Sequence, residues 1–375
     1  MIKCSTFYEM LITRGISFFT GVPDSLLKDF CAYITDHVPD NQHVIAANEG
    51  GAVALAAGHY LATGHIGLVY MQNSGQGNAV NPLTSLADPD VYGIPILLLI
   101  GWRGEPGVKD EPQHAKQGKI TLQILQTLDI PYRILPENVE EADLCLEDLF
   151  AEISTHKCPA ALIVKKGVFD SYKLKQTAKD ISLLSREYAI QKIVDSLRPT
   201  DILVSTTGMI SRELYEYRDA IDGNHSSDFL TVGSMGHASQ IAMGIALAKP
   251  DRQVFCLDGD GAALMHLGAM AIIGSRNLNN FKHIILNNAA HDSVGGQPTA
   301  GKDVAFTKIA IACGYKSTLV VESQEELRDL LPPLLATQGP ALLEIRVRKG
   351  ARADLGRPKT TPHENKAAFM EFLSK

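Results

Sequence analysis

Two polar motifs in the second half of the chain each follow an apolar segment, and their residue types suit phosphate and metal chemistry. The tetrapeptide Asp258–Gly261 comes directly after the apolar run Val254–Leu257, and the pair Asn287–Asn288 closes a second apolar run. Residues 262–277 are rich in Ala, Leu, Met and Ile and predict one helix between two buried parallel strands. This order of strand, glycine turn, helix and strand returns both motifs to the same edge of a sheet.

The chemistry expected at that edge is the binding of a diphosphate through a divalent cation. Gly259 and Gly261 let the backbone approach phosphate oxygens closely, and the first helical turn, which includes Ala262, offers free N–H groups. Asp260, an asparagine side-chain carbonyl and a loop carbonyl can supply the oxygen ligands that Mg²⁺ prefers. Either motif alone is more often a surface turn, but the two together, in register with two strands, favour the diphosphate site.

A second candidate site lies in the first half of the chain, where a carboxylate opens a helix of small residues. Glu49 follows the strand-like run His43–Ala47 and precedes the Gly- and Ala-rich segment 50–58. Small residues let a ligand ring and a neighbouring subunit come close. Alone, Glu49 is an acidic residue favoured at a helix N-terminus by about 0.3–1 kcal/mol. Beside the diphosphate motif it becomes a candidate acid–base group.

Both halves of the chain predict the same class of fold. The chain has 375 residues, enough for two domains of ordinary size. Short apolar strands alternate with helical patterns, which predicts an α/β protein with two doubly wound parallel sheets. Little apolar periodicity is found in residues 167–187, so we expect a first domain at 1–170, a linker at 171–187 and a second domain at 188–375. The expected strands are 16–19, 44–46, 66–70, 96–100, 161–164, 202–204, 229–232, 254–257, 283–286 and 342–345.

Composition excludes several classes of function. A net charge of −7 and the lack of a basic tail argue against a nucleic-acid partner. No apolar run approaches the roughly 18 residues needed to span a bilayer, and the first residues lack the apolar core of a signal peptide. We therefore expect a cytoplasmic enzyme without a membrane partner. The six cysteines contain no Cys-x-x-Cys pair and predict neither a zinc site nor a disulfide framework.

With both of these candidate sites, the chain resembles the thiamine diphosphate-dependent decarboxylases. The segments 21–27, 72–78, 101–107, 291–299 and 354–358 carry the resemblance over nearly the whole chain. There is no room for the extra domain that pyruvate decarboxylases and acetolactate synthases carry in the middle. The compact form is similar to the phosphonopyruvate decarboxylases and the related sulfopyruvate decarboxylases.

The resemblance implies a fold, cofactors, a reaction and a partner. It implies two domains of the thiamine diphosphate-binding fold with no middle domain, a pyrimidine-binding domain followed by a diphosphate-binding domain. The cofactors would be thiamine diphosphate and Mg²⁺, and Glu49 would protonate the aminopyrimidine ring. The reaction would convert 3-phosphonopyruvate into phosphonoacetaldehyde and carbon dioxide, a step of phosphonate (2-aminoethylphosphonate) biosynthesis. The active site would form between chains of a homo-oligomer.

Carried over residue by residue, the resemblance names the cofactor contacts. The metal ligands would be Asp260, the side chain of Asn288 and the backbone carbonyl of Ala290. The loop here is one residue longer than in the yeast-type enzymes, and Asn287 remains an alternative to Asn288. The remaining cofactor contacts would be Gln76, the backbone of Gly208 and Met209, the carbonyl of Gly233, and Met235, whose side chain would prop the bent cofactor unless it is a core methionine.

The substrate carries a carboxylate and a phosphonate and needs a cationic or N–H-rich pocket. Arg103, Lys109 and His114 lie in the segment 101–118 after an expected strand, where ligands of parallel sheets bind. Arg103 and Lys109 are candidates for substrate binding and His114 for catalysis. The segment could close over the substrate and exclude water, or it could be a solvated loop with ordinary ion pairs.

Three further residues are candidates for catalysis and substrate contact. Asp24 is placed for a proton relay and Ser25 for substrate contact, unless the two cap a helix that begins at Leu26. His291 follows the asparagine pair and could hold the phosphonate or transfer a proton, with a surface histidine as the alternative.

Other classes of protein remain to be weighed. A nicotinamide dehydrogenase is disfavoured because the glycine-rich segments 75–80 and 259–264 lack the third glycine of the dinucleotide fingerprint. A non-catalytic relative would be expected to lose Glu49 or Asp260, and both are present. A sulfopyruvate decarboxylase, or another small thiamine diphosphate-dependent decarboxylase or carboligase, is the alternative within the enzyme interpretation.

Overall fold

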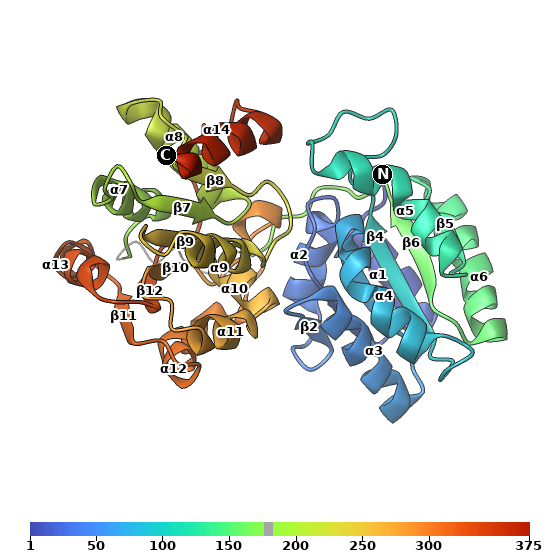
Figure 1. Ribbon diagram of the computed structural model, residues 1–375. Helices are drawn as coiled ribbons and strands as arrows, with labels where there is room; N and C mark the ends of the chain where they lie inside the picture. The colour runs from blue at the N-terminus through green and yellow to red at the C-terminus, as the bar shows by residue number, and fades with distance from the viewer. Residues whose placement is uncertain (176–182) are drawn as a thin grey trace. The chain divides into compact units, whose positions relative to one another are not determined.

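The structure, a computed structural model, describes residues 1–175 and 183–375 and contains two compact units, Met1–Gln176 and Thr177–Lys375. Each unit is built around one six-stranded sheet whose strands are all parallel (Figure 1). The linker expected at 171–187 includes residues 176–182, which lie outside the described residues. Within the rest of that range, Ser185 caps a helix that begins at Arg186. The linker therefore stays a prediction.

In the first unit, alternate residues of the central strands enter two separate hydrophobic cores. Leu97 and Leu99 pack on one face, while Ile96, Leu98 and Ile100 pack on the other. The first core is completed by α1 (Cys4–Thr13), α2 (Lys28–His37) and α6 (Val139–His156), and the second by α3 (Glu49–Thr63), α4 (Gln76–Pro82) and α5 (His114–Thr127). The strands are β1 (Phe18–Gly21), β2 (His43–Ile45), β3 (Gly67–Gln72), β4 (Ile96–Gly101), β5 (Tyr132–Ile134) and β6 (Ala160–Val164), in the order β2-β1-β3-β4-β6-β5.

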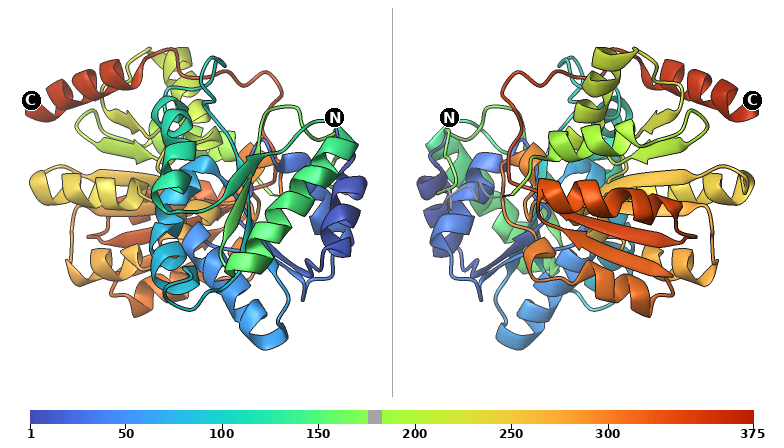
Figure 2. Two further views of the ribbon diagram at one scale, coloured as in Figure 1. Left: turned by 90° about the vertical axis from the view of Figure 1, so that its right-hand side faces the viewer. Right: turned by 90° about the vertical axis from the view of Figure 1, so that its left-hand side faces the viewer.

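The second unit repeats this design. One core is formed with α7 (Arg186–Asp195), α8 (Met209–Ile221) and α13 (Gln324–Ala336), and the other with α9 (Ala238–Ala248), α11 (Ala269–Ser275), α12 (Phe306–Ala312) and α14 (Pro362–Ser374) (Figure 2). The strands are β7 (Ile202–Ser205), β8 (Asp228–Leu230), β9 (Val254–Gly259), β10 (Phe281–Asn287), β11 (Ser317–Val321) and β12 (Ala341–Arg346), in the order β11-β12-β10-β9-β7-β8. Counted from the opposite edge, this is the strand order of the first unit.

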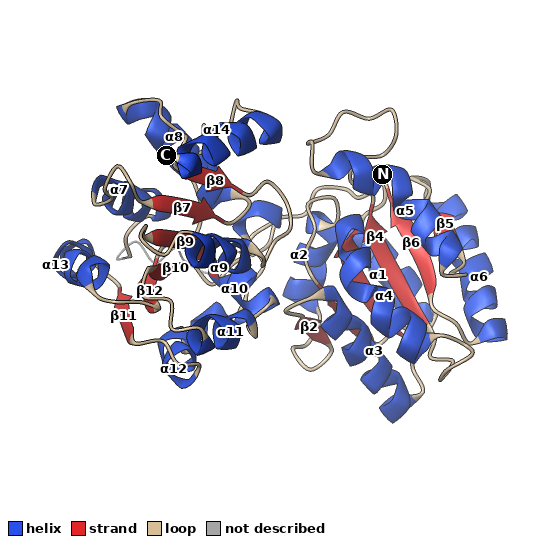
Figure 3. Cartoon of the chain, in the orientation of Figure 1, coloured by secondary structure: helices blue, strands red, loops and turns tan. Residues whose placement is uncertain are grey.

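The alternation of strands and helices confirms the predicted α/β class with no middle domain (Figure 3). Two strands, β5 and β11, are missing from the prediction. Both lie at sheet edges, and only Val321 among their residues is buried, whereas the prediction includes the other two edge strands, β2 and β8. Short helical turns complete the elements: 3-10 turns at Asn73–Gly75, Asp292–Val294 and Ala300–Lys302, and a π turn at Leu83–Ala87.

Three expected helix boundaries are wrong. The single helix expected at 262–277 is two helices, α10 (Asp260–Met265) and α11, because His266 leaves the helical conformation with φ −131° and ψ 53°. Gly268, a weak helix former, precedes the second helix. The segment expected as a loop at 101–118 ends earlier, since α5 begins at His114. Helix α2 begins at Lys28 rather than Leu26. Among the described residues, no helix is long and apolar enough to cross a membrane.

Candidate active site

Glu49 lies at the start of α3, beyond the carboxyl end of β2, and its carboxylate is held by two neighbouring elements. The side chain of Asn48 caps the helix by accepting the N–H of Gly51 at 2.8 Å. Glu49 is only 5% exposed, and its Oε2 accepts a hydrogen bond from Nδ2 of Asn78 at 2.7 Å. A Cβ on Gly75 would lie 2.5 Å from Oε1 of Glu49, so a glycine is needed there. The carboxylate position is therefore fixed from both sides.

A buried amide cluster lies beyond the carboxyl end of β3. Asn73 is fully buried and donates from Nδ2 to the carbonyl of Arg103 at 2.7 Å and to Oγ1 of Thr121 at 2.9 Å. Gln76 donates from Nε2 to the carbonyl of Thr121 at 3.2 Å, while its Oε1 is buried without a hydrogen-bond partner. An unpaired buried acceptor is costly, so Gln76 fits a ligand that donates a hydrogen bond.

Arg103 follows β4 and is held by a residue that the sequence interpretation missed. Its Nε and Nη2 donate to the two carboxylate oxygens of Asp110 at 2.8 and 2.5 Å, and its Nη1 donates to Oγ of Ser25 at 2.6 Å. Burial alone raises the pKa of Asp110, but Arg103 and the N–H groups of Glu111 and Gly104 hold that pKa well below its usual range. Three of the five guanidinium N–H donors are used, which leaves two for a ligand.

Asp24 is fully buried after β1, next to this cluster. Its Oδ2 accepts the N–H of Leu26 at 2.7 Å, whereas its Oδ1 is buried and has no hydrogen-bond partner in the part of the chain that the structure describes. Burial raises the pKa of Asp24, against the opposing effects of the Leu26 N–H and Arg103. Because α2 begins two residues after Leu26, Asp24 does not cap that helix. The side chain is thus a buried carboxyl group with one free oxygen.

The other two residues expected in this segment have different surroundings. Lys109 is exposed in the loop between β4 and α5. His114 is buried as the first residue of α5, and its backbone packs so closely on Gly104 that a Cβ there would clash with it. The structure therefore joins Arg103 to Ser25, and brings neither Lys109 nor His114 into that pair.

Asp260 begins α10 in the second unit and is 2% exposed. The hydroxyl of Thr299 donates to its Oδ2, and the backbone N–H groups of Asn288 and Gly261 also hydrogen-bond to the carboxylate. Burial raises the pKa of Asp260 to about 6 despite these donors. None of the described lysine or arginine side chains forms an ion pair with it. A buried carboxylate without a cationic partner fits a site for a metal ion.

The asparagine pair lies beside Asp260, and each of its amide nitrogens is directed at a carboxylate. Asn287 donates from Nδ2 to Oε1 of Glu344 and to the carbonyl of Gly301, both at 2.8 Å. Asn288 donates from Nδ2 to Oδ2 of Asp292 at 2.6 Å. The sequence interpretation missed both carboxylates. Glu344 lies in β12, far away in sequence, and Asp292 looked like part of a loop.

The structure brings both asparagines to Asp260, in different ways. A Cβ on Gly301 would lie 2.5 Å from Oδ2 of Asp260 and 2.8 Å from Oδ1 of Asn287. These two oxygens therefore lie close to the same point beside Gly301. Asn288 reaches Asp260 through its backbone N–H. The Oδ1 of Asn288 accepts the N–H of Ala290 at 3.1 Å, which folds the loop back over the pair.

Three glycine-containing turns complete this edge of the second sheet. Gly208 precedes α8 with φ 95°, and a Cβ there would lie 2.7 Å from Oγ of Ser293. Met209 therefore starts the helix next to a residue that has no side chain to cover the backbone N–H groups. The loop with Gly233 and Met235 follows β8, and both residues are half-buried. Gly259 ends β9, while Gly261 and Ala262 belong to the first turn of α10. These groups lie at carboxyl ends of neighbouring strands.

His291 lies over the glycine turn. A Cβ on Gly261 would be 3.1 Å from Cε1 of His291. Burial lowers the pKa of His291 to about 4, with Asp292 opposing, so the ring is neutral at pH 7. A neutral imidazole can donate one hydrogen bond and accept another, but it supplies no charge to hold a phosphonate.

Among the described residues, one further group of side chains of metal-ligating types lies in the core of the second unit. Ligand atoms of Cys256, Asp258 and His283 lie within 4.8 Å of one another. His283 and Asp258 are already hydrogen-bond partners at 3.3 Å, and Oδ1 of Asp258 accepts the N–H of Gly259 at 3.0 Å. The group thus ties β10 to the glycine turn.

Comparison with known proteins relates each unit to a cofactor-binding domain of one enzyme family. Residues 5–125 match the family model described as thiamine pyrophosphate enzyme, N-terminal TPP binding domain, and residues 206–345 match its C-terminal TPP binding domain. A phosphonopyruvate decarboxylase of Streptomyces viridochromogenes is 34% identical over 100% of this chain and 96% of its own length. This chain belongs to the thiamine pyrophosphate enzymes.

Other relatives agree with this family. A phosphonopyruvate decarboxylase of Streptomyces hygroscopicus is 36% identical over 100% of this chain and 94% of its own length. A sulfopyruvate decarboxylase subunit beta of Methanocaldococcus jannaschii is 41% identical over 36% of this chain and 70% of its own length. The resemblance to thiamine diphosphate-dependent decarboxylases predicted from the sequence is confirmed. As a thiamine pyrophosphate enzyme, the protein has one cofactor-binding domain in each unit.

Proposed function

We propose that this enzyme decarboxylates 3-phosphonopyruvate without oxidation, giving phosphonoacetaldehyde and carbon dioxide, as a step of phosphonate biosynthesis. The observation that carries the proposal is the likeness to two phosphonopyruvate decarboxylases over the full length of the chain. The arginine at the end of β4, with donors left for an anion, supports a substrate that bears two acidic groups.

The diphosphate of the cofactor is held through Mg²⁺ in this proposal. Asp260, the side-chain carbonyl of Asn288 and the backbone carbonyl of Ala290 are the protein ligands, with Asn287 as the alternative asparagine. The absence of a cationic partner for the buried Asp260, among the described residues, supports the assignment. The backbone of Gly208, Met209, Gly259, Gly261 and Ala262 contacts the phosphate oxygens.

Bound thiamine diphosphate supplies the carbon nucleophile for the 2-oxo group and the electron sink for the electrons that carbon dioxide leaves behind. Glu49 exchanges a proton with the pyrimidine ring, and its fixed carboxylate supports this role. The free Oε1 of Gln76 accepts a hydrogen bond from the cofactor. In the second unit, the carbonyl of Gly233 and the side chain of Met235 position the ring.

Substrate contact falls to the residues that follow β1 and β4. Arg103 and Ser25 bind the anionic groups, and the exposed Lys109 adds charge when the loop closes. Asp24, with one free oxygen and a raised pKa, donates the proton that completes the product. His114 and His291 assist proton transfer, and His291 also contacts the phosphonate as a neutral donor.

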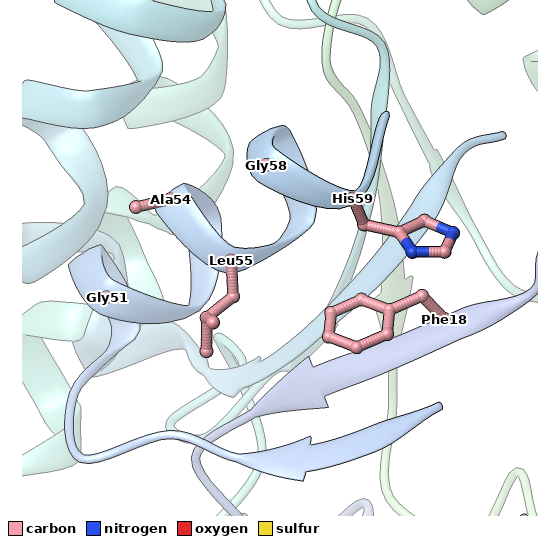
Figure 4. A pocket seen from close by; sticks show the side chains of 6 residues that line it. All are labelled: Phe18, Gly51, Ala54, Leu55, Gly58 and His59. Carbon is pink, nitrogen blue, oxygen red and sulfur yellow. The ribbon is translucent and has the colours of Figure 1, made fainter. Parts of the chain in front are cut away.

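We further propose a homo-oligomer in which α3 contacts a second copy of the chain. The outer side of α3 carries small residues next to exposed Leu55, and with Phe18 and His59 they line a shallow pocket (Figure 4). Glu49 starts the same helix, so a neighbouring chain on this face would lie close to the active site. The pocket residues are Phe18, Gly51, Ala54, Leu55, Gly58 and His59.

The first test is carbon dioxide release from phosphonopyruvate, sulfopyruvate and pyruvate in parallel, each with and without thiamine diphosphate and Mg²⁺. We expect release that depends on both cofactors and is fastest from phosphonopyruvate. Preference for sulfopyruvate would favour the second candidate, a sulfopyruvate decarboxylase. The partial matches to sulfopyruvate decarboxylase subunits support that alternative. No release from any of the three would contradict the substrate proposal and favour a carboligase.

Mixing two inactive variants tests the shared active site. If Glu49 and Asp260 of one site come from different chains, a mixed dimer of Glu49→Gln and Asp260→Ala chains contains one intact site and one doubly altered site. We expect activity to reappear after the two variants are unfolded and refolded together. Each variant refolded alone is the control. If both residues of a site came from the same chain, the mixture would stay inactive.

A further inference from the structure

The orientation of the Asn288 amide is determined by what surrounds its nitrogen. Nδ2 of Asn288 faces Oδ2 of Asp292 at 2.6 Å. A carboxylate can only accept hydrogen bonds, so the group facing it must be the amide N–H and the carbonyl oxygen must point the other way. That oxygen accepts one hydrogen bond, from Ala290. An amide carbonyl has a second lone pair, which remains for a cation.

Asp292 is itself fixed by three donors that meet at one oxygen. Its Oδ2 accepts from Nδ2 of Asn288, from the N–H of Gly350 at 2.9 Å and from Nη1 of Arg186 at 3.0 Å. The Arg186 guanidinium is 4% exposed and forms a two-point ion pair with Glu213, which is 2% exposed, at 2.8 and 3.0 Å. A buried pair of this geometry has little freedom to move.

We propose that Asp292 is a positioning residue for the cofactor-bound metal ion, because it fixes the carbonyl oxygen of Asn288 as the atom that faces the ion. Arg186 and Glu213 hold Asp292 in place from the core of the second unit. The proposal rests on the function proposed above, in which Asn288 is a metal ligand. Partners outside the ligand sphere orient metal ligands in this way in many sites, and their loss lowers metal affinity about 10–100-fold.

Two variants of Asp292 separate the acceptor atom from the charge. Asp292→Ala removes the acceptor, so the Asn288 amide can rotate. Asp292→Asn keeps a carbonyl oxygen that can occupy the position of Oδ2 and accept from Nδ2 of Asn288 with one of its two lone pairs. We expect the Mg²⁺ dissociation constant, measured by titration calorimetry on the full chain with thiamine diphosphate present, to rise about 10–100-fold in Asp292→Ala. In Asp292→Asn it should stay within about threefold of wild type.

A second readout and a matched control exclude a general loss of structure. The kcat of Asp292→Ala at saturating Mg²⁺ should approach that of wild type, since excess metal overcomes a weakened site. Asp201 is a buried carboxylate that also pairs with an arginine, the exposed Arg198, at 2.8 Å, and it precedes β7, at the amino edge of the sheet. Asp201→Ala should lower the Tm but leave the Mg²⁺ dissociation constant unchanged.

Four results would overturn the proposal or separate it from its premise. Wild-type Mg²⁺ affinity in Asp292→Ala would overturn it, as would equal losses in Asp292→Ala and Asp292→Asn, because charge rather than the acceptor atom would then act. If Asp292→Ala fails to fold, Asp292→Asn is compared with Asn288→Ala instead. Equal losses of Mg²⁺ affinity in these two folded variants would also count against the proposal. Wild-type protein whose thiamine diphosphate binding ignores Mg²⁺ would instead contradict the proposed function.

Discussion

The two units have the same strand order but opposite chemistry at the carboxyl edges of their sheets. After its third strand, the first unit presents the amide of Gln76, and at the same place the second unit presents the carboxylate of Asp260. After the fourth, the first presents Arg103 and the second presents the asparagine pair. The first edge suits a ring and an anionic substrate, and the second suits a metal–diphosphate pair. A shared topology thus sets where ligands bind, while the side chains decide which ligands they are.

The largest expected effect comes from the first edge. Glu49→Gln keeps the size of the side chain and removes its proton exchange, so kcat should fall about 10²–10⁴-fold. Cofactor affinity should change little, because the proposed diphosphate contacts all lie in the second unit. Steady-state kinetics and titration calorimetry with thiamine diphosphate check both points. Turnover close to wild type would contradict the role of Glu49.

The matching change at the second edge should act on binding instead. Asp260→Ala removes a proposed ligand of Mg²⁺. Metal-dependent retention of thiamine diphosphate should therefore weaken by more than the factor of about 10–100 expected when a residue outside the ligand sphere is lost. Gel filtration followed by cofactor analysis measures this retention. A variant that keeps the cofactor as tightly as wild type would refute the metal assignment.

A glycine beside Glu49 tests the first edge with a smaller change. Gly75→Ala places a methyl group 2.5 Å from the Glu49 carboxylate, which must shift, so kcat should fall about 10–100-fold with unchanged Mg²⁺ affinity. Gly77 lies in the adjoining helix α4 with open space around it, and Gly77→Ala is the control. Equal kinetics for the two variants would show that the exact position of Glu49 is unimportant.

Arg103 should matter for the anionic end of the substrate. Arg103→Lys keeps the charge but loses the planar fork that binds Asp110 and Ser25, so kcat/KM for phosphonopyruvate should fall about tenfold or more. Any slow turnover of pyruvate, which lacks the phosphonate, provides an internal control and should change less. An equal loss for both substrates would place Arg103 outside the phosphonate contact.

The smallest effect concerns stability and its dependence on pH. Because burial raises the pKa of Asp24, the folded protein favours its protonated form. This group's contribution to the free energy of unfolding is fully present below the pKa of Asp in the unfolded state, about 3.9. The contribution is lost as the pH rises through the raised pKa of Asp24 in the folded state. Asp24→Asn is neutral at every pH, so its Tm should exceed that of wild type by a few degrees near pH 8 and converge with it as the pH falls. A Tm difference independent of pH would contradict this account.

Much of the site could be predicted because its residues follow inner strands. The apolar runs before Asp260 and Asn287 mark β9 and β10, and parallel neighbours bring their ends together. The partners of these residues could not be predicted. Glu344 reaches Asn287 from β12, and Thr299 reaches Asp260 across a loop, so only the pairing of distant segments reveals them. Two of the four edge strands, β5 and β11, escaped prediction: a charged residue separates the apolar residues of β5, and only one residue of β11 is buried.

The sequence by itself determined the α/β class, the family and the positions of Glu49, Asp260 and the asparagine pair, since these depend on local order along the chain. Only the tertiary structure decided that Arg103 is already paired with Asp110, that the half-buried His291 has a lowered pKa, and that Asp292 accepts a hydrogen bond from the amide of Asn288. These properties depend on distances between segments and on burial. No local pattern of residues encodes them.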